Sequence, residues 1–127
     1  MALLIFERPP MINSKDIRTR DAGAAMDLLC PRCGADNLHH FGVTFFERAE
    51  DAAELVRLTH FPPSLKTEVV RSDVSGNPSS RRDGLAVRFY CEQCGGETED
   101  DVIELTIAQH KGSTEIGWRF TPRVPRP

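Results

Sequence analysis

Two short stretches decide the fold of this chain, Cys30-Pro31-Arg32-Cys33-Gly34 and Cys91-Glu92-Gln93-Cys94-Gly95, and both follow the pattern CxxCG. Two residues between the cysteines allow a tight turn to aim both thiolates at one ion, and the glycine permits the left-handed backbone that such turns need. Four thiolates complete the tetrahedral shell of Zn²⁺ and leave no position for water or substrate. The two stretches therefore predict one structural zinc ion held by Cys30, Cys33, Cys91 and Cys94.

Other uses of the cysteines are thiol–disulfide chemistry at one CxxC unit and an iron–sulfur or other cluster. A redox CxxC is expected to open a helix near a βαβ pattern, and no helical period follows either pair here. The long segment between the pairs counts somewhat against a shared zinc site. The four histidines are expected to serve in packing or at the surface rather than as ligands, because the thiolates already complete the shell: His39, His40, His60 and His110.

Composition indicates one small domain with many turns. The chain has 127 residues, nine glycines and nine prolines, so its core is modest and gains from a metal staple. The formal net charge of -3 provides no overall positive field for nucleic acid or anionic lipid. The apolar run Met1–Phe6 stops at Glu7, too short to span a membrane. We expect a cytoplasmic protein, in a reducing compartment where paired thiols favour metal.

Alternating hydrophobicity predicts antiparallel strands within the insertion between the knuckles and after the second knuckle. His39, Phe41, Val43 and Phe45 fall on one face of a strand over 38–46. Further strands are expected at 55–61, 65–71 and 85–90, the last running into Cys91. The carboxy-terminal half predicts a three-stranded meander, whose apolar face carries these side chains: Leu85, Val87, Phe89, Ile103, Leu105, Ile107, Thr114, Ile116, Trp118 and Phe120.

The predicted fold is small and all-β: a metal-stapled zinc ribbon with an antiparallel β-meander, a long insertion between the knuckles and a disordered amino-terminal arm. We expect a flexible arm over residues 1–26, the zinc-ribbon domain over 27–121 and a flexible tail over 122–127. Residues 72–84 are rich in turn formers and predict an exposed loop.

Several segments resemble small zinc-ribbon proteins of actinobacteria and their phages. They include the first knuckle, Asn77-Pro78-Ser79-Ser80-Arg81-Arg82-Asp83-Gly84, Phe89-Tyr90-Cys91-Glu92-Gln93-Cys94-Gly95 and Gln109-His110-Lys111-Gly112. The resemblance covers about residues 28 to 120 and implies a zinc-ribbon fold; those relatives are functionally uncharacterised. The acidic stretch 97–101 and residues 1–26 have no counterpart in that pattern.

Two binding roles compete. A protein–protein adaptor on a larger intracellular machine fits the net acidity, whereas a nucleic-acid-binding ribbon would use the Arg81-Arg82 loop with Arg32 and Lys111. Trp118, Tyr90 or Phe41 would then serve for stacking, although core packing is favoured for Trp118 because it shares a face with Ile116 and Phe120. The arginine pair could also be solvated or paired with acidic residues. No open metal position or phosphate-cradling loop suggests an enzyme, and neither membrane binding nor a small-molecule substrate is expected.

Overall fold

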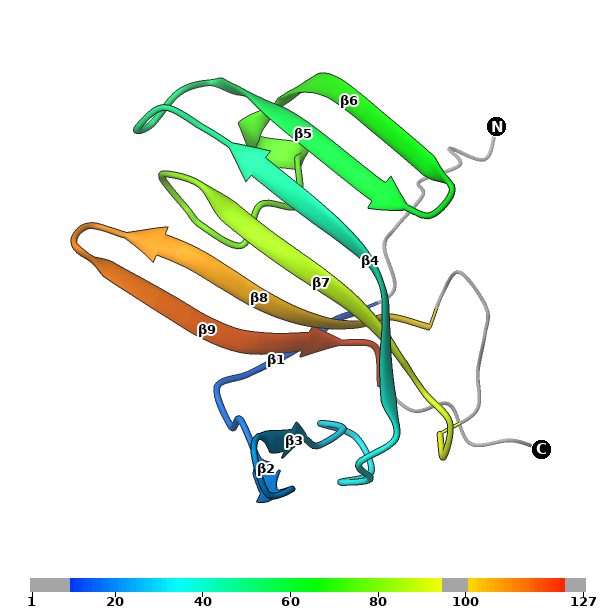
Figure 1. Cartoon of the computed structure of the whole chain (residues 1–127). Helices are drawn as coiled ribbons and strands as arrows, with labels where there is room; N and C mark the ends of the chain where they lie inside the picture. The colour runs from blue at the N-terminus through cyan, green and yellow to red at the C-terminus, as the bar shows by residue number, and fades with distance from the viewer. Residues whose placement is uncertain (1–9, 95–100, 123–127) are drawn as a thin grey trace, which may run out of the picture.

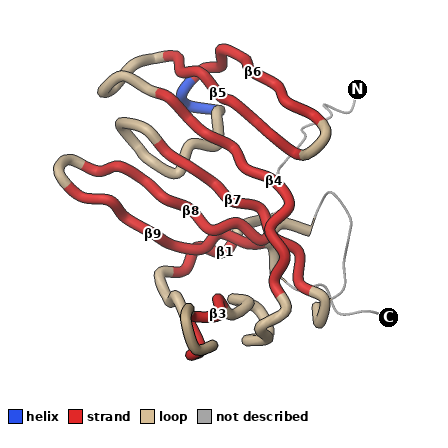
Figure 2. The backbone as a smooth tube through the Cα atoms, in the orientation of Figure 1, coloured by secondary structure: helices blue, strands red, loops and turns tan. Residues whose placement is uncertain are grey.

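The computed structural model describes residues 10–94 and 101–122, and the regular secondary structure in this part of the chain is almost all strand (Figure 2). One short 3₁₀ helix, η1 (Ser72–Val74), interrupts it, and no helix in the described ranges is long and apolar enough to cross a membrane. The strands are β1 (Ile12–Ser14), β2 (Thr19–Asp21), β3 (Met26–Leu28), β4 (Leu38–Glu47), β5 (Glu54–Phe61), β6 (Ser64–Arg71), β7 (Gly84–Cys91), β8 (Ile103–His110) and β9 (Ser113–Phe120).

Seven of these strands form one antiparallel sheet in the order β1-β9-β8-β7-β4-β5-β6 (Figure 1). It consists of two meanders, β4-β5-β6 and β7-β8-β9, joined where β4 pairs with β7. β2 and β3 form a separate hairpin below the sheet. The predicted all-β fold with a carboxy-terminal meander is confirmed. Four of the seven strands, β4 to β7, come from the insertion between the knuckles.

A β-bulge in β4 changes which side chains of this strand point together. His40 pairs with Phe89 and Gly42 with Arg88, so Phe41 is an extra residue without a partner on β7. His39 and Val43 therefore lie on opposite faces of the sheet. The prediction that alternate residues from His39 to Phe45 share one face is wrong, and Phe46 is the buried aromatic of this strand.

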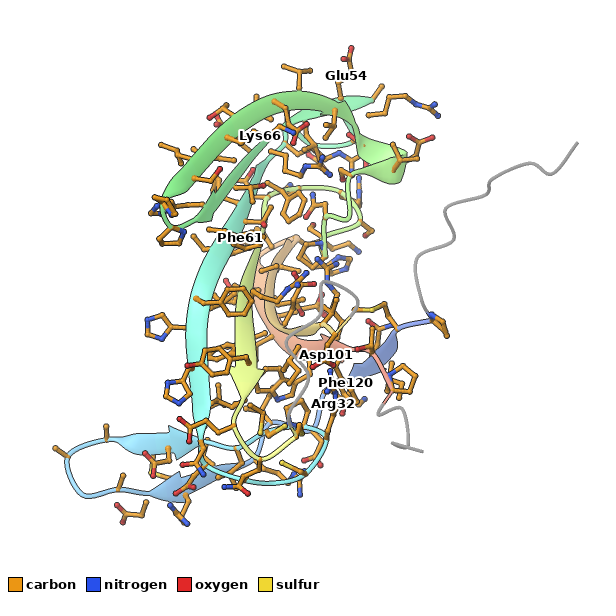
Figure 3. All side chains as sticks on the ribbon, turned by 90° about the vertical axis from the view of Figure 1, so that its right-hand side faces the viewer. Arg32, Glu54, Phe61, Lys66, Asp101 and Phe120 are labelled. Atoms are coloured by element: carbon orange, nitrogen blue, oxygen red, sulfur yellow. The ribbon has the colours of Figure 1, made fainter. Side chains whose placement is uncertain are left out.

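Residues paired across neighbouring strands share a face of the sheet, so the register defines two faces. We call the face that carries Thr44, Phe46 and Ala86 the groove face, and the opposite face, with Phe45, Leu85 and Ile107, the open face. The sheet is curved, and Phe61 and Lys66 of the groove face lie on its concave side (Figure 3).

Each face has a small core at a different end of the sheet. On the groove face, the loop after β6 lies beside a core of Phe46, Leu55 and Ala86. On the open face, the knuckles and the β2–β3 region cover a larger core, built from these buried residues: Cys30, Cys91, Cys94, Ile103, Trp118 and Phe120. Trp118 is 2% exposed, so its predicted alternative role in the core is confirmed.

The amino-terminal region is more ordered than the sequence indicates. Ile12 pairs with Phe120 and Ser14 with Trp118, so β1 forms an edge of the main sheet. Ile17 and Leu28 pack against the core on the open face. For residues 10–26 the prediction of a flexible arm is wrong. Backbone pairing and apolar contacts with distant residues order this segment, although its own sequence has little preference for regular structure. Residues 1–9, most of the predicted tail and most of the acidic stretch lie outside the described residues.

The predicted exposed loop over 72–84 is folded back on itself. Ser75 and Ser79 are buried, and the Ser79 hydroxyl donates to the carbonyl oxygen of Gln109 at 2.7 Å. The Asn77 amide donates to the Arg82 carbonyl at 2.7 Å, and the Asn77 side-chain oxygen accepts from the Ser79 backbone at 3.0 Å. The prediction of an exposed loop is therefore wrong at these positions, because side-chain hydrogen bonds replace solvent.

Candidate metal centre

The first knuckle is a tight turn closed by backbone hydrogen bonds. The Gly34 N–H donates to the Cys30 carbonyl at 2.9 Å, and the Cys30 N–H donates to the Ala35 carbonyl at 2.8 Å. Gly34 has φ +77°, the left-handed conformation predicted for a glycine after the second cysteine. This turn places Cys30 and Cys33 on the same side of the backbone.

Strand register brings the second knuckle beside the first. Leu38, the first residue of β4, pairs with Cys91, the last residue of β7. The Glu92 N–H continues this ladder by donating to the Asn37 carbonyl at 3.2 Å. The β4–β7 pair thus joins cysteines that are far apart in the sequence.

The four sulfur atoms form a compact cluster, and all lie within 4.8 Å of one another. Cys30 Sγ is 3.8 Å from Cys94 Sγ, and Cys33 Sγ is 3.6 Å from Cys91 Sγ. A tetrahedron with metal–sulfur bonds of about 2.3 Å has sulfur–sulfur edges of about 3.8 Å. The cysteines are free thiols rather than disulfides. The predicted ligand set is therefore brought together with the spacing that a metal ion requires.

Burial of the cluster disfavours the charged thiolate form of its cysteines unless a cation is bound. Desolvation raises the pKa of Cys30 and of Cys94. At Cys33 burial acts in the same direction, but hydrogen bonds from the Ala35 backbone and from neighbouring thiols outweigh it and lower the pKa. A divalent cation would supply the positive charge that stabilises four thiolates in this environment.

Arg32, predicted as a partner-binding residue, instead fastens the first knuckle to the sheet. Its side chain is 5% exposed and lies beside Asp101 (Figure 3), with which it forms an ion pair. Nη2 also donates to the Val102 carbonyl at 3.0 Å and to the Thr121 hydroxyl at 3.1 Å. Arg32 is thus unavailable to an external partner.

The Arg81-Arg82 loop is also paired internally. Arg81 makes a two-pronged contact with Asp51, Nε to Oδ1 at 3.0 Å and Nη2 to Oδ2 at 2.8 Å. Glu50 accepts from Arg81 at 3.0 Å and lies 3.2 Å from Arg82. The hydrogen bond from Arg81 is the largest cause that lowers the pKa of Asp51. The predicted alternative of internal pairing is confirmed. Lys111 lies in the exposed β8–β9 turn, two residues after Gln109, whose backbone is hydrogen-bonded to Ser79 and Asp83 of this loop.

The histidines stand apart from the sulfur cluster. The cluster contains only the four cysteines among the described residues. His39 Nε2 lies 2.6 Å from a carboxylate oxygen of Glu92, and its ring stacks on Tyr90 with centroids 4.6 Å apart. Both rings are exposed beside the second knuckle.

Sequence reasoning missed a group of charged residues on the groove face. Glu104 is 8% exposed, and its carboxylate lies 2.8 Å from Arg119 Nε and 3.6 Å from Arg88 Nε. Arg57 pairs with Glu68 at 3.1 Å on neighbouring strands. These charged residues alternate with apolar ones along their strands, which could have indicated that one face of the sheet is polar. The sequence pattern could not have indicated that this face is partly buried.

Comparisons with known proteins give no match, whether to family models, to curated proteins or to solved structures.

Proposed function

We propose that this protein is a non-catalytic, zinc-stapled module that binds another protein through the open face of its sheet. Zinc is the metal that best fits the cluster, because four thiolates in a closed tetrahedral arrangement favour it and leave no coordination position for a substrate. The metal then fixes one end of a rigid sheet. We place the protein in the cytoplasm, where the thiols stay reduced.

The single observation that carries the binding role is the exposed apolar surface on the open face. The exposed fraction is 66% for Leu65, 67% for Val69, 54% for Ile116 and 41% for Phe45. Further partly buried apolar side chains connect them on the same face: Val43, Val56, Leu58, Leu85, Val87 and Ile107. A continuous apolar surface of this kind on a small protein indicates a contact site.

The size and charge of this surface suit a partner protein with an apolar patch of its own. Six strands at spacings of about 4.8 Å give a face about 24 Å wide, enough for the core of an ordinary protein interface. Charged side chains of these strands occupy one end of the face, where Glu47, Glu54 and Arg71 lie in register with the apolar rows. The centre carries no charge that a partner would have to neutralise.

The alternative of a nucleic-acid-binding ribbon has less support. Arg81 and Arg82 share Glu50 and Asp51, so their positive charge is largely balanced. Tyr90 and Phe41 are exposed and suited to stacking, but the arginine beside them in the sheet, Arg88, is only 20% exposed in its side chain and so is largely shielded from a polynucleotide backbone. We therefore favour a protein partner.

A matched pair of substitutions on β9 tests the proposal. Ile116 and Glu115 are adjacent and exposed but lie on opposite faces, so Ile116→Lys charges the open face and Glu115→Lys charges the other. Both changes should alter stability by less than about 0.5 kcal/mol. We expect I116K to reduce binding of an apolar fluorescent dye to the folded protein and to abolish retention of a stoichiometric partner from extract of the source organism.

E115K should match the natural chain in both measurements. If I116K retains the partner as well as E115K does, the open face is not the binding surface. If neither protein retains a partner and the dye binds none of the three proteins, the proposed role fails.

A further inference from the structure

The groove face contains a second candidate site, independent of the open face. The sheet floor, the loop after η1 and the segment around Met11 line an open groove of about 640 Å³. This volume is in the range of small-molecule sites in proteins. Its lining includes Arg57, Phe61, Glu68, Arg88, Glu104 and Arg119.

Positive charge exceeds negative charge in this groove. Its lining contains Arg57, Lys66, Arg88 and Arg119 against two carboxylates, Glu68 and Glu104. Lys66 is 69% exposed in its side chain, whereas the three arginines are 17% to 23% exposed. Glu68 pairs with Arg57 and Glu104 with Arg119, so the excess lies on Lys66 and Arg88. Of these two, Arg88 is largely shielded from water, where an anion is attracted more strongly than at an exposed site.

Two of the arginines donate hydrogen bonds to both a carboxylate and a backbone carbonyl. Arg57 donates to the Ser75 carbonyl at 2.9 Å and to Glu68 at 3.1 Å. Arg119 donates to the Gly76 carbonyl at 2.6 Å and to Glu104 at 2.8 Å. These bonds hold the loop after η1 against the sheet, so both residues have a structural role.

Arg88 differs from both of them. The side chain of Arg88 donates no hydrogen bond within the described residues. Its Nε is buried without a hydrogen-bond partner and lies 3.6 Å from the Glu104 carboxylate. Its guanidinium lies 5.8 Å from the centre of the Phe61 ring. Gly42 makes room for this ring, since a Cβ there would lie 1.7 Å from a Phe61 ring carbon. A guanidinium has five N–H donors, and a shielded one whose donors make no hydrogen bond to the protein can bind an anionic ligand.

From this juxtaposition we propose that the groove binds a small organic anion, whose carboxylate or phosphate pairs with Arg88 and whose apolar part contacts Phe61. The flat guanidinium can donate two parallel hydrogen bonds to either group. Phe61 supplies apolar surface beside it. The proposal concerns a bound ligand and not a reaction, and it goes beyond the sequence analysis, which expected no small-molecule substrate.

The test is a nuclear magnetic resonance titration of the zinc-loaded full chain with two probes, inorganic phosphate and acetate. At least one probe should shift the Nε–H signal of Arg88 and the backbone amides of Thr59 and Phe61 in a saturable manner, with a dissociation constant of about 1 mM or lower. Arg88→Gln should lose saturable binding. Arg88→Lys, which keeps the charge beside Glu104, should weaken it about ten-fold because the two-pronged contact is lost.

Arg71→Gln is the matched control, because Arg71 is 71% exposed and does not line the groove. It should bind the probe as the natural chain does. Shifts that rise without saturation, or that equal those caused by sodium chloride at the same ionic strength, would overturn the proposal. So would full affinity in R88K. Should R88Q lose its folded spectrum, the natural chain and R88K decide the outcome.

Discussion

At the scale of single residues, Arg32 links the metal centre to the main sheet. Arg32 lies between the first two cysteines of the cluster. Its side chain donates hydrogen bonds to Val102, just before β8, and to Thr121, just after β9. Its pairing with Asp101 takes place in a nearly water-free position. A guanidinium there has three acceptors from distant parts of the chain, so it orients the knuckle as well as filling space.

We therefore predict that Arg32→Ala destabilises the folded, zinc-loaded protein by about 3 kcal/mol, because Asp101 is left without its buried partner. For a chain of this length that loss corresponds to a fall in Tm of about 10 °C. Thermal unfolding followed by circular dichroism measures it. The control is Arg71→Ala, which removes an exposed pair with Asp73 and should cost less than about 0.5 kcal/mol. Equal effects of the two substitutions would refute the role given to Arg32.

At the scale of elements, the bulge in β4 sets the geometry of the sheet where both meanders meet. Gly42 follows the extra residue Phe41 and lies directly beneath Phe61 of β5. A side chain at position 42 would displace this ring. The bulge therefore determines which side chains of β4 lie on each face of the sheet. It also determines the position of an aromatic residue in the groove.

Gly42→Ala should consequently destabilise the protein by about 2 kcal/mol, as overpacking does elsewhere. In a Phe61→Ala background the same change should cost less than about 1 kcal/mol, since the ring it would strike is gone. Chemical denaturation of the four proteins of this cycle gives the coupling. Gly112→Ala serves as the control, because an added Cβ there meets no atom within 4 Å and should be tolerated. Additive costs for Gly42 and Phe61 would show that the close approach has no energetic weight.

The same element shows how far the sequence could predict this structure. Alternation identified β4 to β9 closely in position, and turn composition identified the ends of the two knuckles. It did not identify the bulge, because an extra residue leaves a run of Phe, Val and Thr looking like one regular strand. β1 was missed for a different reason: only Ile12 of its three residues favours a strand, and the segment is held by pairing with Phe120, Arg119 and Trp118.

The sequence predicted one candidate site and did not settle the roles of residues at the others. The ligand set of the metal centre follows from local spacing alone, and the structure brings those four cysteines together. The roles of Arg32 and Arg81 depended on which carboxylates would lie nearby, and those come from residues 101 and 50–51. Long-range pairing of this kind is fixed by the fold, so composition could not supply it.

At the scale of the whole molecule, the metal joins a core that would otherwise be too small. Three of the six buried residues in the open-face core are cysteine ligands, and Trp118 packs edge-on against Phe89 in the same core, with ring centroids 5.8 Å apart. The groove-face core has only Phe46, Leu55 and Ala86. Because β4 and β7 contribute to both ends of the sheet, loss of one core weakens the other.

Removing the metal should therefore unfold the chain cooperatively rather than locally. Structural zinc contributes apparent binding free energies of about 10–16 kcal/mol in small domains, which matches or exceeds the usual net stability of a folded protein. The natural chain, purified with one zinc per molecule, should lose it to excess chelator under reducing conditions. The emission of Trp118, the only tryptophan and 2% exposed, should then move to longer wavelength. Stoichiometric zinc should reverse the shift, and Cys91→Ser should show it from the start. Metal-free protein that keeps a buried Trp118 and a cooperative unfolding transition would mean that the sheet folds without its staple.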